Sequence, residues 1–161
     1  MHNKSKTIAL LVASALLSAC VTPVPTAAII GLDKEALLQK LGKPTREAMS
    51  QSGERWDYSR GHEGIFMYFV HIDSDGRVAR YEQVLSEENF ARIKSGMTKA
   101  EVIEMIGEAP RQNKIARGRG YVWSYKNFRS SVCIWFQIEF DPNHVVRSTG
   151  YNRRPAIAAC R

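Results

Sequence analysis

The stretch Gly61-His62-Glu63-Gly64 brings a histidine and a carboxylate together, directly ahead of a strongly apolar run. Such a pair could supply a metal ligand beside a general acid or base. Zinc sites need two or three ligands that converge, and the positions of His71 and His144 do not suggest convergence with His62. We therefore predict that the two glycines form the bend of a hairpin, that His62 and Glu63 point to solvent, and that the chain holds no metal and no other cofactor.

Other catalytic arrangements are not found along the sequence either. It contains no G-x-S-x-G elbow, no cysteine beside a histidine, and no pair of carboxylates in apolar surroundings. Asp57 follows Trp56 in a strand-like segment, and we expect its side chain at a solvent-facing position. The sequence therefore predicts that the protein is not an enzyme.

The N-terminal 19 residues are predicted to be an export signal. Two lysines precede an apolar run from Thr7 to Leu17, which is shorter than the roughly 20 residues that a membrane-spanning helix needs. The run ends in Leu17-Ser18-Ala19-Cys20, which resembles the lipobox of bacterial lipoproteins. The thiol of Cys20 would then carry the lipid, and each buried methylene of its acyl chains would contribute about 0.8 kcal/mol to membrane binding.

Residue 21 is Val and not Asp. By resemblance to lipoprotein sorting in enteric-type bacteria, this favours the outer membrane over the inner membrane. We therefore expect a lipid-anchored protein of the outer membrane that faces the periplasm.

Two cysteines, Cys133 and Cys160, remain after the lipidated one. They have neither a C-x-x-C spacing nor clustered histidines, so they do not indicate a metal site. An oxidising compartment would allow them to form a disulfide that ties down the C-terminal tail. In the alternative, Cys133 is a free thiol beside Trp135 and Cys160 lies on a mobile tail.

The charge of the chain indicates acidic partners. The net charge is +7, and removal of the signal leaves 21 basic against 16 acidic residues. The segment from Arg111 to Arg129 has six basic residues and no acid: Arg111, Lys114, Arg117, Arg119, Lys126 and Arg129. It could contact anionic lipid headgroups beside the anchor, at about 1 kcal/mol per basic residue, or be a solvated loop. An exported protein is not expected to bind nucleic acid.

The elements that must position these residues occur twice. The segment from Ile29 to Pro44 is echoed from Lys94 to Pro110, where Thr98 and Glu101 form a helix-capping box. Gly42 and Gly107 are expected to end the two helices.

Each helix is followed by Trp-x-Tyr, such as Trp56-Asp57-Tyr58, whose spacing places both rings on one face of a strand. A longer alternating strand, a turn and a third strand follow, with an offset of 65 to 68 residues between the copies. An additional helix, capped by Ser86 and with Phe90 and Ile93 as apolar anchors, precedes the second copy. The pattern predicts an α+β fold with two units, each with helices on one face of a three-stranded antiparallel sheet.

The predicted domain organisation follows from this repeat. Residues 1–19 are the signal, 20–28 a linker, 29–85 the first unit, 86–154 the second unit and 155–161 a tail. If helices cover only one face of the second sheet, Trp135 is exposed on the other face, where it could bind a protein. In the alternative, the first unit or the tail covers Trp135.

The landmarks together resemble the BamE (SmpA/OmlA) family of outer-membrane lipoproteins. They are the lipobox at Cys20, the Gly96-Met97-Thr98 helix with its trailing glycine and proline, the Trp-x-Tyr strand and the Gly61–Gly64 hairpin. The resemblance implies a non-enzymatic role, with partners in the β-barrel assembly machinery. It implies one such domain, whereas this chain has two units with the landmarks divided between them. Tandem units also resemble the secreted β-lactamase inhibitor proteins, so an envelope-anchored binding or inhibitor protein is the alternative.

Overall fold

The computed structural model describes residues 23–50, 53–129 and 132–153. The predicted signal, Cys20 and Cys160 lie outside these ranges, and so do the side chains of His62, Arg129 and Cys133. None of the helices within the described ranges is long and apolar enough to cross a membrane.

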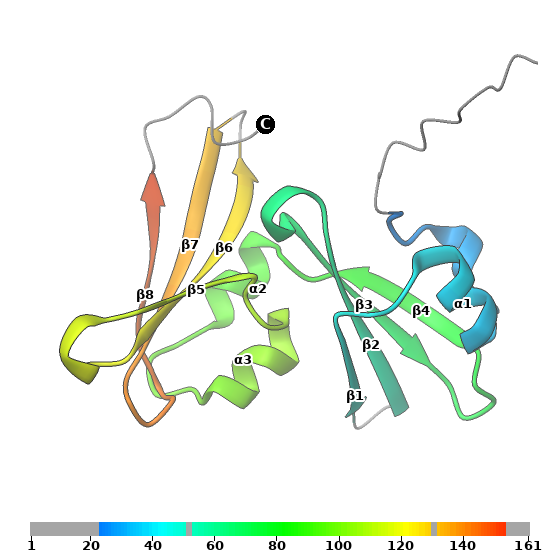
Figure 1. Ribbon diagram of the computed structural model, residues 1–161, viewed down its shortest axis with the longest axis horizontal. Helices are drawn as coiled ribbons and strands as arrows, with labels where there is room; N and C mark the ends of the chain where they lie inside the picture. Colours follow the sequence, from blue (N-terminus) through cyan, green and yellow to red (C-terminus); the bar gives the residue numbers. More distant parts are fainter. Residues whose placement is uncertain (1–22, 51–52, 130–131, 154–161) are drawn as a thin grey trace, which may run out of the picture.

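The fold is α+β, as predicted, with two antiparallel sheets (Figure 1). The first sheet contains β1 (Arg46–Ser50), β2 (Gly53–Arg60), β3 (Phe66–Ile72) and β4 (Val78–Gln83), in that order. The second contains β5 (Arg111–Lys114), β6 (Tyr121–Arg129), β7 (Val132–Phe140) and β8 (Val146–Arg153), also in that order. The helices are α1 (Lys34–Leu41), α2 (Glu87–Arg92) and α3 (Lys99–Ile106), with short 3-10 turns η1 (Ala27–Ile29), η2 (His62–Gly64) and η3 (Ala116–Gly118).

The prediction of three strands per sheet is wrong, because each sheet has a fourth strand that precedes the Trp-x-Tyr strand. These strands, β1 and β5, have the polar sequences REAMS and RQNK. They lie at the edge of their sheets and pair with one neighbour each, so their backbone bonds form without an apolar face. Alternating hydrophobicity, the signal that marks a half-buried strand, is therefore missing from both.

The helix signals in the sequence are confirmed. The side chains of Asp33, Ser86 and Thr98 accept hydrogen bonds from backbone N–H groups in the first turns of α1, α2 and α3. Thr98 and Glu101 form both halves of the capping box. Gly42 and Gly107 end α1 and α3 at φ values of 74° and 76°, a conformation that glycine adopts without steric cost.

The described residues form two hydrophobic clusters, one within the first unit and one shared by both units. Here the first unit means α1 with the first sheet, and the second unit means α2 and α3 with the second sheet. Leu37 of α1 packs on the face of the first sheet that carries Trp56 and Tyr58. Both α2 and α3 lie between the two sheets (Figure 1). Met67 and Phe69, from the other face of the first sheet, belong to the same buried cluster as side chains of α2, α3 and the second sheet. The first sheet is therefore covered on both faces.

A buried charge cluster lies where the first sheet meets α3. Arg55 and Asp57 are 3% and 2% exposed, and the Arg55 guanidinium donates to both carboxylate oxygens of Asp57 at 2.7 and 3.2 Å. Arg55 also donates to a carboxylate oxygen of Glu104 at 2.8 Å, and its guanidinium carbon lies 3.8 Å from the centroid of the Phe69 ring. The prediction that Asp57 faces solvent is wrong, because the second unit covers this face of the sheet.

The Gly61–Gly64 segment is a bend, as predicted, with Gly61 and Gly64 at φ values of 76° and 64°. Glu63 is exposed, as predicted, but it also forms a contact that the sequence did not predict. Its carboxylate accepts a hydrogen bond at 3.0 Å from the ammonium of Lys126 in β6, a side chain that is only 1% exposed. A Cβ at position 64 would come within 2.7 Å of the Pro110 side chain, so only glycine permits this close approach. The segment therefore joins the two units.

His71 gives the fold a dependence on pH. Burial lowers the pKa of His71, whose Nε2 lies 2.9 Å from a carboxylate oxygen of Glu82 and whose Nδ1 lies 3.3 Å from the Arg80 guanidinium. The folded state thus binds a proton at His71 less readily than the unfolded chain. We expect stability to be unaffected by this group above the ordinary histidine pKa and to fall as the pH drops below it, by at most about 1.4 kcal/mol per pH unit.

Urea unfolding between pH 7.5 and 5 would measure this effect. His71→Gln removes the titrating group, so the slope of unfolding free energy against pH should flatten in this window. An unchanged slope in His71→Gln would assign the pH dependence to other groups.

Candidate protein-binding groove

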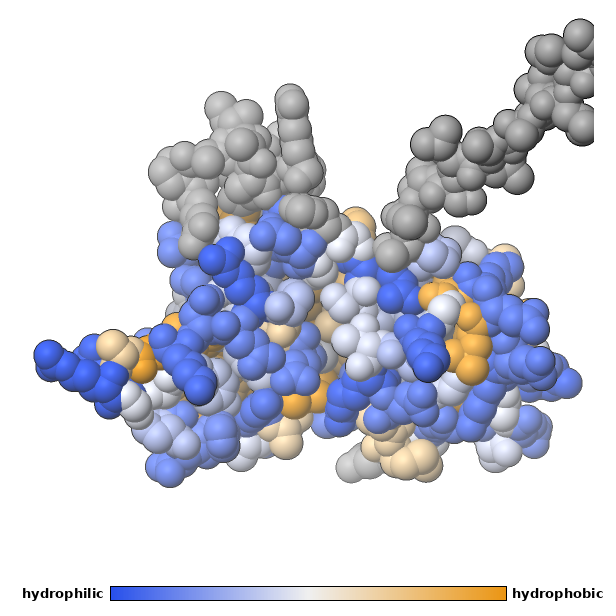
Figure 2. Space-filling view, viewed as in Figure 1, coloured by the Kyte–Doolittle hydropathy of each residue, from blue (hydrophilic) through white to orange (hydrophobic). Residues whose placement is uncertain are grey.

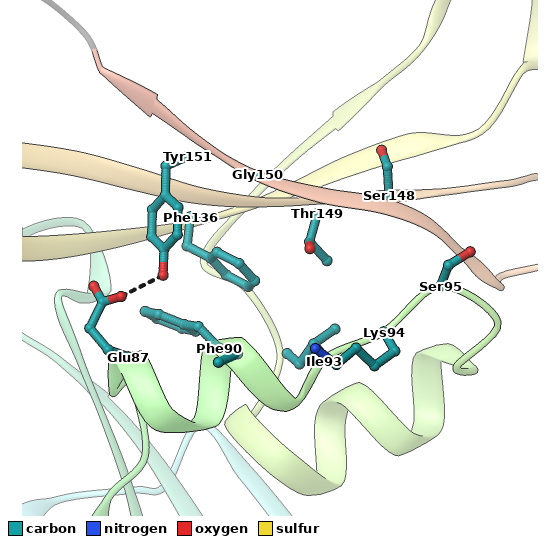
Figure 3. A pocket seen from close by; sticks show the side chains of 11 residues that line it. Glu87, Phe90, Ile93, Lys94, Ser95, Phe136, Ser148, Thr149, Gly150 and Tyr151 are labelled. Atoms are coloured by element: carbon teal, nitrogen blue, oxygen red, sulfur yellow. Dashed lines mark hydrogen bonds between the residues drawn. The ribbon is translucent and has the colours of Figure 1, made fainter.

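A groove lies between α2 and β8 in the second unit (Figure 3). Its volume is about 510 Å³. The lining side chains come from α2, the segment that follows it, β7 and β8: Glu87, Phe90, Ala91, Ile93, Lys94, Ser95, Phe136, Ser148, Thr149, Gly150 and Tyr151. One wall is a helix and the other is a strand at the edge of a sheet.

The floor of the groove is apolar because α2 turns its hydrophobic residues toward the sheet. Phe90 is 1% exposed and stacks on Phe136 of β7, with 4.3 Å between the ring centroids. Ile93, at the end of the helix, is also buried. These contacts hold α2 against the second sheet and place aromatic carbon beneath the groove.

The strand wall is built by alternation along β8. Thr149 and Tyr151 point toward α2, whereas the Ser148 side chain points away (Figure 3). The Tyr151 ring lies 5.3 Å from the Phe136 ring, and its hydroxyl donates to the Glu87 carboxylate at 2.7 Å. This hydrogen bond crosses the groove at one end, and Lys94 lies among the lining residues of the other end (Figure 3).

The backbone of β8 is the chemically distinctive part of the groove. In the described sheet β8 is paired with β7 and lies at the edge. An edge strand presents N–H and C=O groups that can pair with another extended chain. Residues 147–152 are exposed, and the space around the missing side chain of Gly150 is open. Glycine within a strand is typical of a site where another backbone approaches closely.

The predicted contact residue Trp135 is not on an open surface. Its side chain is 4% exposed, and the Arg111 guanidinium carbon lies 5.5 Å from its ring centroid. Trp135 pairs in register with Lys126, whose ammonium binds Glu63 of the first unit. Of the two alternatives that the sequence left open, the structure shows a covered Trp135.

The basic segment from Arg111 to Arg129 does not form one surface. Lys114, Arg117 and Arg119 are exposed in and around η3, at one end of the long axis of the molecule (Figure 1). Lys126 is buried in its ion pair with Glu63, and Arg111 is half-buried against Trp135. The described part of the segment thus divides into an exposed loop and two side chains that stabilise the fold.

Apolar side chains are also exposed near the start of the described chain. Val24, Ile30 and Leu38 are 40%, 48% and 37% exposed. Figure 2 shows hydrophobic surface over the part of the first unit that contains α1, on a face that is otherwise mostly hydrophilic. These residues follow the predicted lipid attachment site closely in sequence.

The groove is not predicted by the sequence. The sequence does predict α2 with its anchors Phe90 and Ile93, and both side chains are buried. The second wall, β8, is predicted as the third strand of its unit, but its hydrophobic pattern does not indicate that it lies at the edge of the sheet. The polar sequence RSTGYN of residues 147–152, with its central glycine, is the signal that could have indicated an exposed edge.

Comparison with solved structures finds weak likenesses to bacterial proteins. An osmotically inducible lipoprotein, OsmE, is 21% identical with a TM-score of 0.37, over 44% of this chain and 82% of that chain. A β-lactamase inhibitor protein from Streptococcus mutans is 14% identical with a TM-score of 0.33, over 82% and 89% of the two chains. An SCP-domain extracellular protein from Bacillus anthracis is 17% identical with a TM-score of 0.31, over 95% of this chain and half of its own.

At these TM-scores the likenesses establish neither a shared fold nor a shared function. No protein-family model matches the chain, and no curated protein matches it.

Proposed function

We propose that this protein is an outer-membrane lipoprotein that serves as a protein-binding module in the assembly of outer-membrane β-barrel proteins. The observation that carries the binding role is the groove between α2 and β8, which combines an apolar floor with an available strand edge. An extended segment of a partner protein would add to β8 as a further strand and place side chains over Phe90 and Phe136. The lipobox at Cys20 supports the anchor, and the resemblance to the BamE family supports the role in barrel assembly.

The proposed anchor suggests an orientation for the molecule. Pro23 follows Cys20 by three positions, and such a segment spans at most about 10 Å. The exposed apolar side chains Val24, Ile30 and Leu38 would then lie near the membrane surface. In this orientation the first unit faces the membrane, and the groove of the second unit is accessible to proteins of the periplasm.

The alternative of a protein that clasps a partner between its units has less support. The space between the two sheets is filled by α2 and α3, and Met67 and Phe69 of the first sheet are buried in the shared core. A partner could enter there only if that core opened. The exposed residues Lys114, Arg117 and Arg119 remain available for contacts with acidic proteins or lipid headgroups, and we propose this as a secondary role for the η3 loop.

Site-specific crosslinking in intact cells tests the groove. We expect a photoreactive amino acid at Thr149, which faces α2, to capture a component of the barrel-assembly machinery. The same group at Asn152, on the opposite face of β8, should capture far less. Thr149→Lys should lower the yield of the co-purified partner about tenfold or more, because the ammonium group would have to be desolvated over an apolar floor. Asn152→Lys is the matched control.

Equal crosslinking at the two positions, or an unchanged yield of the partner with Thr149→Lys, would show that the partner does not bind in the groove. The anchor is tested in the same cells, because Cys20→Ala should move the protein out of the membrane fraction or leave it unprocessed. A mature N-terminus elsewhere, without acyl mass, would contradict the lipoprotein assignment. Capture of a periplasmic enzyme in place of the assembly machinery would favour the inhibitor-like alternative.

A further inference from the structure

The internal repeat places two pockets at equivalent positions in the two units. The pocket of the first unit has a volume of about 590 Å³, and that of the second about 260 Å³. Lys34 and Lys99 are the first residues of α1 and α3, and each lines its pocket. Glu54 and Tyr121 each lie two residues before the tryptophan of Trp-x-Tyr, and they also occupy equivalent places in the linings.

The pairing of strands extends the equivalence. Met49 pairs with Glu54 in the first sheet, and Lys114 pairs with Tyr121 in the second. The turn before β4 is Asp73-Ser74-Asp75-Gly76, and the equivalent turn before β8 is Asp141-Pro142-Asn143-His144. Gly76 and His144 therefore occupy the same position, the last of each turn. At these equivalent positions the first pocket has a methionine, a glutamate and a glycine, and the second pocket has a lysine, a tyrosine and a histidine.

In the first unit, one carboxylate satisfies two donors. The Glu54 carboxylate accepts a hydrogen bond from the Trp56 indole Nε1 at 2.7 Å, and its other oxygen forms an ion pair with the Lys34 ammonium. The hydrogen bond from Lys34 lowers the pKa of Glu54, so this carboxyl is charged at neutral pH. The lysine and the buried indole thus share an acid that belongs to the chain itself.

In the second unit the same donors lack that acid. Trp123 is fully buried, and its Nε1 has no hydrogen-bond partner among the residues that the structure describes. The Lys99 ammonium lies 5.0 Å from the centroid of the Trp123 ring. Its carboxylate partner is Glu108, at 3.5 Å and substantially exposed. The nearby Asp141 carboxylate accepts hydrogen bonds from the backbone N–H groups of its own turn.

The second pocket has His144 at a position where the first has a glycine in the left-handed conformation. The φ of His144 is 65°, where Gly76 of the first unit has 75°. A residue with a Cβ is strained in this conformation, and such strain is typical of functional positions. The imidazole Nδ1 lies 2.8 Å from the Tyr121 hydroxyl, at the edge of a pocket that also contains Lys99 and Lys114.

We propose that the pocket of the second unit binds a carboxylate from a ligand, in the place where the first unit has the carboxylate of Glu54. Lys99 and Lys114 line the pocket and supply the positive charge. The Trp123 indole lies behind the lining and supplies a hydrogen bond once the neighbouring Lys99 and Tyr121 side chains move to admit the ligand. A volume of about 260 Å³ accommodates a small organic acid or the acidic end of one peptide residue, so the carboxylate can come from either source. This site is separate from the groove and does not depend on the function proposed for it.

Proton–nitrogen NMR of the tryptophan indoles tests the proposal directly. The chain has three tryptophans, so the mature protein in detergent micelles gives three indole signals that single Trp→Phe changes would assign. We expect sodium acetate to shift the Trp123 indole signal downfield with a saturating curve, because a new hydrogen bond forms. The Trp56 signal should stay in place, because Glu54 already accepts its hydrogen bond. Sodium chloride at equal ionic strength controls for screening.

Three variants sharpen the test. Lys99→Gln should weaken the binding of acetate about tenfold, since it removes the charged donor. Lys34→Gln, the equivalent change in the first unit, should leave it unaltered. Tyr121→Glu should abolish the response, because it supplies within the chain the carboxylate that the ligand otherwise brings.

Peptides separate the two sources. The amide of N-acetyl-glutamate and a tripeptide with a free C-terminus would reproduce the shift if peptides are the ligands, and an amidated tripeptide without acidic side chains would not. A shift with acetate alone would assign the site to small acids. The proposal is overturned by an unmoved Trp123 signal, by an equal shift with chloride, by inorganic phosphate acting where acetate does not, or by an equal response in Lys99→Gln.

Discussion

Replacement of Asp57 by Asn should lower the free energy of unfolding by about 3–5 kcal/mol. The change leaves the Arg55 guanidinium, which is 3% exposed, without the carboxylate that accepts two of its hydrogen bonds. Glu104 still binds Arg55, but its side chain is 47% exposed and its charge is screened by solvent. A buried cation with only a partial counter-charge is far more costly than the loss of a surface pair. Equilibrium unfolding in urea measures the change.

The control is Arg147→Ala, which removes an exposed ion pair with Glu139 and should cost no more than about 1 kcal/mol. Burial raises the pKa of Asp57 while Arg55 and Arg46 oppose that shift, so the pair is held against a cost of desolvation. The double replacement of Arg55 by Met and Asp57 by Leu should therefore be much milder than Asp57→Asn alone. Equal losses from Asp57→Asn and Arg147→Ala would show that the cluster is not buried in solution.

Phe90→Ala should also cost about 3–5 kcal/mol. The ring is 1% exposed, stacks on Phe136 and lies 6.2 Å from the Tyr125 ring, so its loss leaves a cavity between α2 and the second sheet. The same ring forms the floor of the groove, and we expect capture of the partner at Thr149 to fall with it. Unfolding in urea and the crosslinking assay report the two effects separately.

Phe66→Ala is the matched control for Phe90→Ala. Phe66 lies in β3, is 38% exposed and contacts Tyr68, so its removal should cost about 1 kcal/mol or less. Similar costs for the two changes would mean that α2 does not pack as described. A large loss of stability without loss of crosslinking would show that the partner binds outside the groove.

Local signals in the sequence predicted local structure well. The capping box of Thr98 and Glu101, the glycine stops at Gly42 and Gly107, and the shared face of Trp56 and Tyr58 all depend on residues within a few positions of one another. Such patterns specify a helix end or a strand face whatever the rest of the chain does. They therefore predicted the helices and the central strands of both units.

Features that depend on distant parts of the chain could not be predicted in this way. Arg55, Asp57 and Lys126 have the sequence character of exposed strand residues, and they are buried because the opposite unit covers them. The edge strands β1 and β5 form by pairing with a neighbour and carry no apolar pattern. The groove likewise requires α2 and β8 to be adjacent, although about 60 residues separate them.

The helices α2 and α3 between the two sheets determine how the molecule can be divided. The sequence contains an internal repeat, but the two units are not independent. Met67 and Phe69 of the first unit are buried against α2, α3 and the second sheet. A fragment that ended at Leu85 would expose this apolar face together with the Arg55–Asp57 ion pair, which would also lose its contact with Glu104. The ancestral unit, had it existed alone, must therefore have closed that face in another way, for instance with a second copy of itself. Fusion of two such copies into one chain would make their unfolding a single cooperative transition.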